Sequence, residues 1–541
     1  MSTSNESDPV EAEKVTLDVN TGGDSAEIFV IDGQFNLVGR GIGPHQAFAL
    51  APGIYKIKVV AGAKTHEEHV VLRPGSKSVR KEFSPLPFST PAPLDDTDKT
   101  HAFHVKAAVQ HSRLVHVQAG VGSWIFVCAR GWSEKTRTDS ATHARPHPAR
   151  GLKLLNDSGE TVVDFEQKAA KNLGWEPWAA CNVSVRPGIY RLQLKVPSLG
   201  RTLEQTVVAS PYWQTQIFLL QRDYGQDTHE AARRGVSDIR ADLSGASVLM
   251  NGPGYIDHLP QPPRSPRLSS PPGFDSGKRV LRQVELARLA LLNQRKILSD
   301  ELRSMLRYKS ENPMLGIFGA HLILLERKSR KEKPDKKRLE KEKADDELLR
   351  EVVKNLRRLV GREHPDVEAI AAFIETPTKY SFNTPPMLQR SWSLICEATA
   401  DNPELVPENS LLSEVAQSWW CNSFWLTWLT PEAGEGSESA EYPDELSDLE
   451  EAVMLQLKAT RRRRRGDSPP ASVAYDLNAS PSEAGSVSRG ASADQDLASD
   501  VELAYLNTEE IKKLTRQLGV PRAVVKKSLD VLRRKIADKK S

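Results

Sequence analysis

The sequence predicts a multidomain protein of the β + α class: two tandem antiparallel β-sandwiches, a helical bundle, a disordered tether and a small C-terminal two-helix module. Three observations predict it. The phrase Pro-Gly-Ile-Tyr occurs twice, the apolar period changes from two residues to 3.6 near residue 278, and residues 431–500 are too polar to bury a core. The predicted segments are a disordered tail (1–13), sandwich one (14–85), a linker (86–100), sandwich two (101–222), a Pro/Ser/Gly-rich linker (223–277), a helical domain (278–430), a disordered acidic and Arg-containing tether (431–500) and a basic helical module (501–541).

The repeated phrase stands in the same surroundings both times, at residues 52–55 and 187–190. An apolar segment, a polar turn and a second apolar segment precede it, and an alternating segment that begins at the tyrosine follows it. Proline ends a loop because it cannot continue a central strand, and glycine permits the tight backbone that starts the next strand. Alternation with one polar face predicts antiparallel strands, so one structural plan is used twice.

These segments resemble the bacterial PEGA-like and carboxypeptidase-regulatory-like β-sandwiches. The pattern L-x-PGIY-x-[IL]-x-[VL] and the turn before it carry the resemblance, which covers about a third of the chain. The second copy departs further from the pattern because of an insertion around residues 174–178. The resemblance implies an accessory binding fold and no particular reaction.

Composition sets limits on localisation and partners. The formal net charge is only +3, so no whole-chain field demands nucleic acid or anionic lipid. The start of the chain is polar, and the longest apolar run, around residues 314–325, is shorter than the roughly 20 residues that a membrane span needs. The four cysteines match no zinc pattern; Cys128 and Cys181 could face each other in sandwich two, although buried reduced thiols are the preferred interpretation. We expect a cytoplasmic protein with no membrane partner.

Apolar residues at three- and four-residue steps predict helices over 278–308, 346–360, 365–375, 386–399 and 409–429. A buried helix is predicted to start after Asn312, which is a suitable N-cap, with Pro313 in the first turn. Residues 312–325 are similar to a segment in helical domains of bacterial conflict and signalling proteins, some of which have caspase-like peptidase partners. The resemblance implies a protein partner, such as a bacterial effector or peptidase, and transfers no catalytic residue.

The last predicted helix of this part is rich in tryptophan. Trp419, Trp425 and Trp428 cannot all lie on one stripe of a helix together with Trp420. They therefore predict either a helix wrapped by the bundle or an exposed docking patch, and the bundle core is the preferred interpretation. The three tryptophans remain candidates for contact with a partner.

The C-terminal residues predict a helix, a turn and a second helix. Asn507 or Thr508 caps the first helix, with an imperfect capping box if Thr508 is the cap, and Gly519 ends it. Residues 501–541 hold eleven Lys or Arg against five Asp or Glu, a net charge of +6. This unit resembles a helix-turn-helix, which implies DNA contacts, but two helices also resemble a death-like adaptor module that pairs with a partner's helices. The candidate binding residues are Arg522, Lys526, Lys527, Arg533 and Arg534.

No motif for catalysis, a cofactor or a metal is evident. The pairs His66/His69 and His101/His104 have i, i+3 spacing, but both are predicted to lie in strands or loops and nothing completes a metal site. We therefore expect no catalytic, cofactor or metal residues, and a non-enzymatic interaction or adaptor protein that binds through its sandwiches and recruits an effector through the C-terminal module. The alternatives are a DNA-binding regulator and an enzyme with an unrecognised site in the helical domain.

Overall fold

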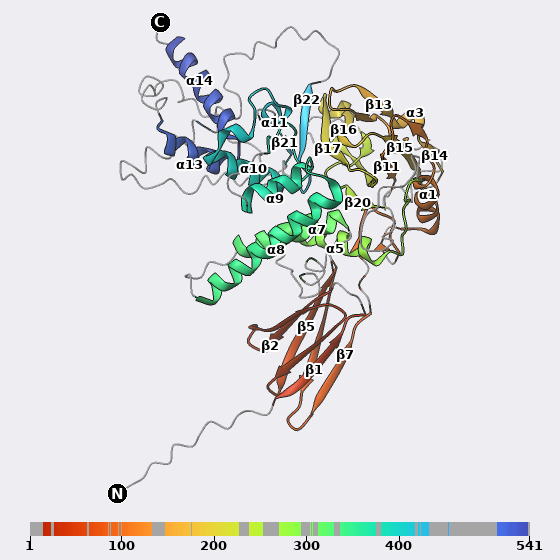
Figure 1. Ribbon diagram of the computed structural model, residues 1–541. Coiled ribbons are helices and arrows are strands. Elements are labelled where there is room, and N and C mark those ends of the chain that lie inside the picture. The colour runs from red at the N-terminus through yellow and green to blue at the C-terminus, as the bar shows by residue number, and fades with distance from the viewer. Residues whose placement is uncertain are drawn as a thin grey trace.

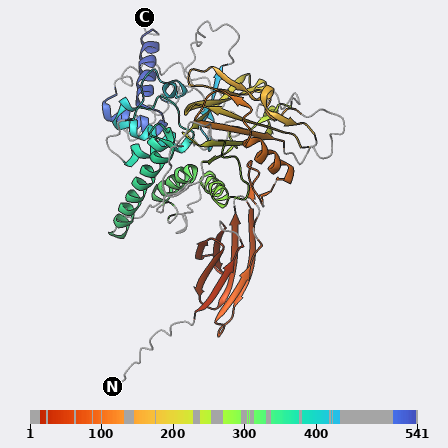
Figure 2. The same ribbon diagram turned by 45° about the vertical axis from the view of Figure 1, so that its right-hand side comes forward.

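The structure, a computed structural model, forms an arm and a larger body (Figures 1 and 2). Residues 14–84 form the arm, and the remaining elements make up the body, with the C-terminal helices at the end opposite the arm. The residues that the structure describes are 14–22, 26–61, 64–84, 86, 88–95, 97–98, 100–131, 146–174, 176–226, 237–252, 270–293, 303, 306, 312–328, 336–374, 380–416, 420–421, 423–431, 453 and 506–538. The predicted tail (1–13) and nearly all of the predicted tether lie outside the described residues.

The arm is built from two sheets, of strand order β4-β1-β7 and β3-β2-β5-β6. Both sheets contribute to one core, which includes Val15, Leu17, Ile28, Val30 and Ile57 and is separate from the core of the body. The strands are β1 (Val15–Asn20), β2 (Glu27–Asp32), β3 (Leu37–Ile42), β4 (His45–Leu50), β5 (Gly53–Ala61), β6 (Lys64–Leu72) and β7 (Ser78–Glu82).

The two-residue alternation in the sequence explains the arm. In β1 every second residue is buried, so one face packs on the core and the other faces outward. One pairing differs from the prediction of a purely antiparallel sheet, because β1 and β7 run parallel. The chain crosses between the two sheets before it forms β7, and such a crossover can return a strand in the same direction as its neighbour.

The β part of the body also has two sheets. The seven-stranded sheet has the order β10-β15-β11-β18-β19, with β14 on β15 and β20 on β18, and the six-stranded sheet has the order β13-β12-β16-β17-β22-β21. Here β11 pairs parallel with β18, and β10 pairs parallel with β15. The strands are β10 (Val117–Gln118), β11 (Ser123–Arg130), β12 (Leu152–Leu155), β13 (Thr161–Asp164), β14 (Ala170–Asn172), β15 (Trp178–Val185), β16 (Gly188–Val196), β17 (Arg201–Ala209), β18 (Gln214–Asp223), β19 (Ile239–Ala241), β20 (Ser247–Asn251), β21 (Trp420–Cys421) and β22 (Thr427–Pro431).

Two predictions for the segments that join these sheets are wrong. The predicted linker 223–277 contains β19 and β20, which extend the seven-stranded sheet, and the predicted helix 409–429 ends at Val415 and is followed by β21 and β22. Residues 427–431 (Thr-Trp-Leu-Thr-Pro) contain threonine and tryptophan, which favour strands, and they pair antiparallel with β17. The apolar spacing that predicted a helix over 409–429 is therefore helical only as far as Val415, and the residues of β22 lie in the sheet.

The helices from residue 279 to residue 415 occur in the predicted order with different lengths, whereas the helices 102–112 and 165–168 were not predicted. Asn312 caps α7 as predicted, since its Oδ1 accepts hydrogen bonds from the backbone N–H of Met314 and Leu315. The predicted helix 278–308 begins as α5, and most of its second half lies outside the described residues. The helices are α1 (Ala102–Ser112), α3 (Phe165–Lys168), α5 (Arg279–Leu292), α7 (Pro313–Lys328), α8 (Lys336–Val360), α9 (Pro365–Ile374), α10 (Gln389–Asp401) and α11 (Leu411–Val415), with 3-10 turns η1 (Pro197–Leu199), η2 (Tyr224–Gln226) and η3 (Pro403–Leu405).

One hydrophobic core joins these helices to the second pair of sheets. It includes side chains of β11 and β18 and of α5, α7, α8 and α9. The indole Nε1 of Trp213 donates to the carbonyl oxygen of Leu359 at 2.9 Å, and that of Trp425 donates to the Ala246 oxygen at 2.7 Å. The sheets of predicted sandwich two and the predicted helical domain therefore share one folded body, since their apolar faces cover each other.

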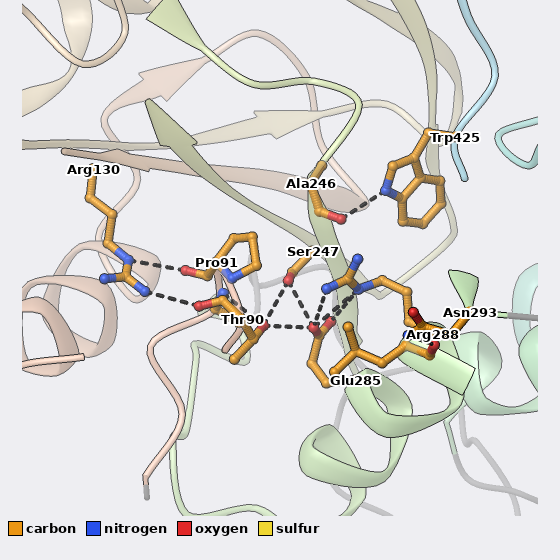
Figure 3. A network of polar contacts seen from close by, with 11 residues as sticks. Thr90, Pro91, Arg130, Ala246, Ser247, Glu285, Arg288, Asn293 and Trp425 are labelled. Carbon is orange, nitrogen blue, oxygen red and sulfur yellow. Dashed lines mark hydrogen bonds and ion pairs between the residues drawn. The ribbon is translucent and has the colours of Figure 1, made fainter. Parts of the chain in front are cut away.

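The segment that leaves the arm is fixed to the body by buried polar contacts (Figure 3). The Oγ1 of Thr90 donates to Glu285 at 2.6 Å, and Ser247 donates to the same carboxylate at 2.9 Å. Arg288 completes the charge pair at 3.0 Å, and Arg130 donates to the carbonyl oxygens of Pro91 and Thr90. A fully buried carboxylate requires such partners, so Thr90 is held in the body. The prediction of residues 86–100 as a linker is therefore wrong in part.

The C-terminal pair of helices, α13 (Thr508–Leu518) and α14 (Arg522–Asp538), packs on α10. Trp392 and Cys396 of α10 both donate to the carbonyl oxygen of Gly519, the left-handed residue that ends α13. Asn507 is the N-cap, and its capping box with Glu510 is complete, so the imperfect box expected for Thr508 does not apply. Val453, from within the predicted tether, is buried in the core of this pair.

Among the residues that the structure describes, no helix combines the length and the apolar character that crossing a membrane requires.

We expect the replacement Trp425→Ala to destabilise the body by about 3–5 kcal/mol, because it empties a fully buried site and leaves the Ala246 carbonyl without its donor. Phe35→Ala is the matched control: its side chain is 87 % exposed, so the body should keep its stability. Urea unfolding of the full chain measures both. Equal stability of the Trp425 variant and the wild type would contradict the buried placement of Trp425.

Candidate functional site

The arm and the six-stranded sheet of the body contain the same four-stranded plan. The order β3-β2-β5-β6 in the arm corresponds to β13-β12-β16-β17 in the body. Tyr55 donates its hydroxyl to the carbonyl oxygen of Ala51 at 2.7 Å, and Tyr190 donates to that of Arg186 at 2.9 Å. Each tyrosine of the repeated phrase therefore closes the loop four residues before it. The bulges match too, at Ile31 in the arm and at Leu155 in the body.

The turn between the first two strands of this plan is also repeated, with one difference. In the arm, the Oδ1 of Asp32 accepts the backbone N–H of Gln34 and Asn36, and Phe35 adopts a left-handed φ of 65°. In the body, Asn156 organises the corresponding turn, and the residue at the left-handed position is Gly159, with φ of 86°. A bulky residue in this conformation is strained, whereas glycine is not. The arm therefore holds a phenylalanine where its internal copy has glycine.

Phe35 belongs to an exposed apolar surface, which we call the tip surface. It comprises Phe35, Leu37, Ile54 and Val71, whose exposed fractions are 87 %, 56 %, 60 % and 55 %. Ile54 and Val71 are direct partners across β5 and β6, and Leu37 pairs with Ile31 on β2. The tip surface lies at the far end of the arm. The other end of the arm joins the body, and there Lys64 forms an ion pair with Asp98.

The corresponding face in the body is covered along β17. Val208, the counterpart of Val71, is only 6 % exposed. Thr206 on the same face donates its hydroxyl to the carbonyl oxygen of Pro385 at 2.8 Å, so the segment before α10 lies over it. One sheet plan therefore appears twice. Its fourth strand is buried against the chain in the body, as β17, and is largely exposed in the arm, as β6.

Charged and titratable groups lie next to the tip surface. The backbone N–H of Asn36 lowers the pKa of Asp32, so its carboxylate stays charged at neutral pH and keeps the turn organised. Burial raises the pKa of the Tyr55 hydroxyl, and the charge of Asp32 adds to this. Next to the apolar residues, Lys56 and Lys58 share one carboxylate, that of Glu67, so this group of three side chains keeps a net positive charge.

Two of the three tryptophan candidates, Trp425 and Trp428, do not lie on the surface. Trp425 is fully buried and Trp428 is 1 % exposed, while Trp419 lies outside the described residues. Trp425 packs with Phe318 and Phe424. This corrects the assignment of Trp425 and Trp428 as partner-contacting residues, because the shared core of the body surrounds Trp425 and a second apolar cluster, which includes Trp392, surrounds Trp428.

The basic candidates divide into two groups. Arg522 is 8 % exposed and donates to the carbonyl oxygen of Ala400, so it is used inside the molecule. Lys526, Lys527 and Arg534 are exposed on α14. Arg533 is half-buried and pairs with Asp530 at 2.6 Å.

The histidine pairs are placed differently from each other. His66 and His69 lie on β6, as expected, but His101 is the N-cap of α1 and His104 lies in its first turn. Glu176 lies 3.1 Å from His101 and 3.6 Å from His104. Burial and the nearby Arg130 charge lower the pKa of His104 to about 3. The positive charge of Arg130 disfavours a metal ion at this place. The described part of the chain brings no three His, Cys, Asp or Glu side chains into an arrangement that could hold one.

One serine–histidine pair occurs in the helical part. His321 Nε2 lies 2.9 Å from the Ser391 Oγ, and both side chains are at most 2 % exposed. Burial lowers the pKa of His321 to about 3, so it is neutral and satisfied by this contact. A substrate does not reach a pair enclosed in this way, and we interpret it as a structural contact between α7 and α10.

Cys128 and Cys181 do not face each other. Cys181 pairs with Val127 in the register of β11 and β15, so the two thiols point to opposite faces of the sheet. Burial raises the pKa of each to about 12, which makes both inert buried thiols.

Comparisons with known proteins give little further information. No protein-family model matches the chain, and no curated protein matches it. A solved structure named "The Bacillus anthracis TIE protein" is similar over 34 % of this chain and 29 % of that chain, less than a third of that protein's length. The identity is 12 % and the TM-score 0.15, and a likeness of this size carries no argument about fold or function.

The tip surface was not among the residues predicted from the sequence. The available signal was the alignment of the two copies, in which Phe35 stands at the position of Gly159. The exposure of Ile54 and Val71 had no such signal, because their counterparts Ile189 and Val208 are also apolar. What covers a strand face depends on distant segments, here residue 385 in the body.

We expect Phe35→Gly to leave the arm at least as stable as the wild type, with a gain of up to about 1 kcal/mol, because it removes left-handed strain from an exposed residue. The converse replacement, Gly159→Ala, should destabilise the body by about 1 kcal/mol, since φ is positive there too. Thermal unfolding of the full chain measures both. A clear loss of stability in Phe35→Gly would show that Phe35 supports the fold and not a binding surface.

Proposed function

We propose that this chain is a non-enzymatic interaction protein, an adaptor whose N-terminal β-sandwich docks a protein partner through the tip surface. The observation that carries the proposal is Phe35, which is 87 % exposed in a left-handed conformation where the internal copy has Gly159. Strain and exposure of a large aromatic side chain both cost folding free energy, and such costs are typical of binding sites.

The shape of the molecule supports the same function. The arm has its own core and ends in the tip surface, on the side away from the body. Aromatic and aliphatic side chains on a rigid sheet lose little conformational entropy when they are buried by a partner. The arm therefore presents a preorganised apolar contact at a distance from the rest of the chain.

The C-terminal pair of helices would recruit a second protein, as an effector-binding module. The apolar side chains of α13 and α14, including Leu514, Val525 and Leu529, are buried within the chain. A partner would therefore contact the exposed basic side chains Lys526, Lys527 and Arg534 of α14. An acidic surface on a protein suits these cations.

A DNA-binding regulator is the second candidate, favoured by the same exposed cations on the second helix of a helix-turn-helix-like unit. Arg522, at the start of that helix, would be expected to contact DNA first, yet it donates to Ala400 in α10. Lys512 and Arg516 both pair with Asp401, which uses two further cations. We therefore place DNA binding second.

The tip surface can be tested with the full chain purified by affinity tag from cells of the source organism. The double variant Phe35→Ser/Ile54→Ser should lower the recovery of a defined set of proteins at least about tenfold, because both exposed contacts are lost. Val121→Ser is the matched control, since Val121 is 54 % exposed on the body. Recovery that is the same for the double variant and the wild type would refute the proposed docking role of the arm.

The two candidate roles of the C-terminal helices predict opposite results for Lys526→Glu/Lys527→Glu. We expect the variant to lose a protein partner that the wild type binds. We expect neither the wild type nor the variant to bind a random duplex DNA at low salt. Mobility shift and quantitative recovery measure the two properties. Duplex binding by the wild type that falls steeply with salt and disappears in the variant would instead establish the DNA-binding regulator.

A further inference from the structure

The strand β6 is an open edge whose internal counterpart is closed. In the body, β17 pairs with β16 on one side and with β22 on the other. In the arm, β6 pairs with β5, and no second strand among the described residues adjoins it. Burial follows the same contrast. All but the first residue of β17 are buried, whereas only Val70 and Leu72 of β6 are.

The two edges correspond residue by residue. Lys58 faces Glu67 across β5 and β6, as Gln193 faces Glu204 across β16 and β17. The ion pair Lys56–Glu67 of the arm has its counterpart in Arg191–Glu204 of the body, at 3.0 Å. By this correspondence, the half of β6 from Lys64 to Glu68 matches the half of β17 that holds β22.

Charged residues often protect an edge strand from pairing. On β6, however, Lys64 and Glu68 already form ion pairs with residues elsewhere in the chain. Glu68 pairs with Lys81 at 3.2 Å, and Lys64 pairs with Asp98 at 3.2 Å. Glu204 of β17 is charged in the same way, and β22 still pairs beside it through Trp428. The strand β6 also contains no proline, and its register with β5 has no bulge.

We propose that β6 accepts an extended segment of a partner protein as an added antiparallel strand, as β17 accepts β22 within the chain. This rests on the proposed docking role of the arm and names the class of partner. Main-chain hydrogen bonds to β6 supply affinity, and alternate side chains supply specificity. The partner segment runs along the whole of β6, from the half that matches the β22-binding half of β17 to Val71. It carries large apolar residues at every second position, and those beside Val71 extend the tip surface.

The test uses a display library of random nine-residue peptides, selected on the immobilised full chain. Selected peptides should share large apolar residues at alternate positions. Val71→Lys should weaken their binding at least about tenfold, and Val121→Lys, at a position of similar exposure on the body, should not. Only one edge of an added strand faces β6, and alternate backbone N–H groups point to opposite edges. Methylating the backbone nitrogens of a selected peptide at one set of alternate positions should therefore abolish binding, and methylating the other set should leave binding unchanged.

The outcomes separate this inference from the function on which it rests. Peptides that are lost with Val71→Lys but tolerate methylation at both sets of positions would keep the docking arm and overturn strand addition. Peptides that bind the Val71→Lys variant normally would overturn the assignment of β6. A wild-type dimer that dissociates on Val71→Lys, measured by sedimentation, would overturn it as well, because a second copy of the chain would then occupy this edge.

Discussion

The pairing of β22 with β17 determines how the body is assembled. An edge strand exposes unpaired N–H and C=O groups, and here a segment more than two hundred residues later in the chain satisfies them. The residues between them include β19 and β20, which join the other sheet, and the helices α5 to α10. Both ends of this long segment are tied into sheets, and the apolar faces of α5, α7, α8 and α9 pack against those sheets in one continuous core.

The arm is joined to this body in a different way. Its core is separate, and its attachment depends on polar groups around Glu285, which is fully buried. A buried carboxylate destabilises a fold unless it is paired, and here Arg288, Thr90 and Ser247 surround it. Since Thr90 follows directly after the arm in the chain, the requirement to satisfy one carboxylate also fixes the point from which the arm projects (Figure 3).

Local patterns in the sequence predicted local structure well. The repeated phrase located β5 and β16, and Asn312 located the start of α7, because tight loops and helix caps depend on neighbouring residues. The strand β22 was missed because its partner lies far away in sequence, and α1 was missed because its face is made of alanine and histidine. The same limit applies to the candidate site. Comparison of Phe35 with Gly159 was open to sequence analysis, whereas the exposure of Ile54 and Val71 depends on the absence of a cover that only the assembled chain reveals.

The internal repeat provides a comparison that a single domain would not. Both copies keep the tyrosine hydrogen bond, the bulge and the cross-strand ion pair, so these features belong to the folding of the plan. What differs is the fourth strand: in the body the chain covers the outer face and the edge of β17, whereas in the arm β6 is largely exposed and no described segment pairs with its edge. Folding alone favours glycine at the position of Phe35 and buried partners for Val71. A copy that departs from both preferences at one end of one sheet has the character of a surface adapted to contact another molecule.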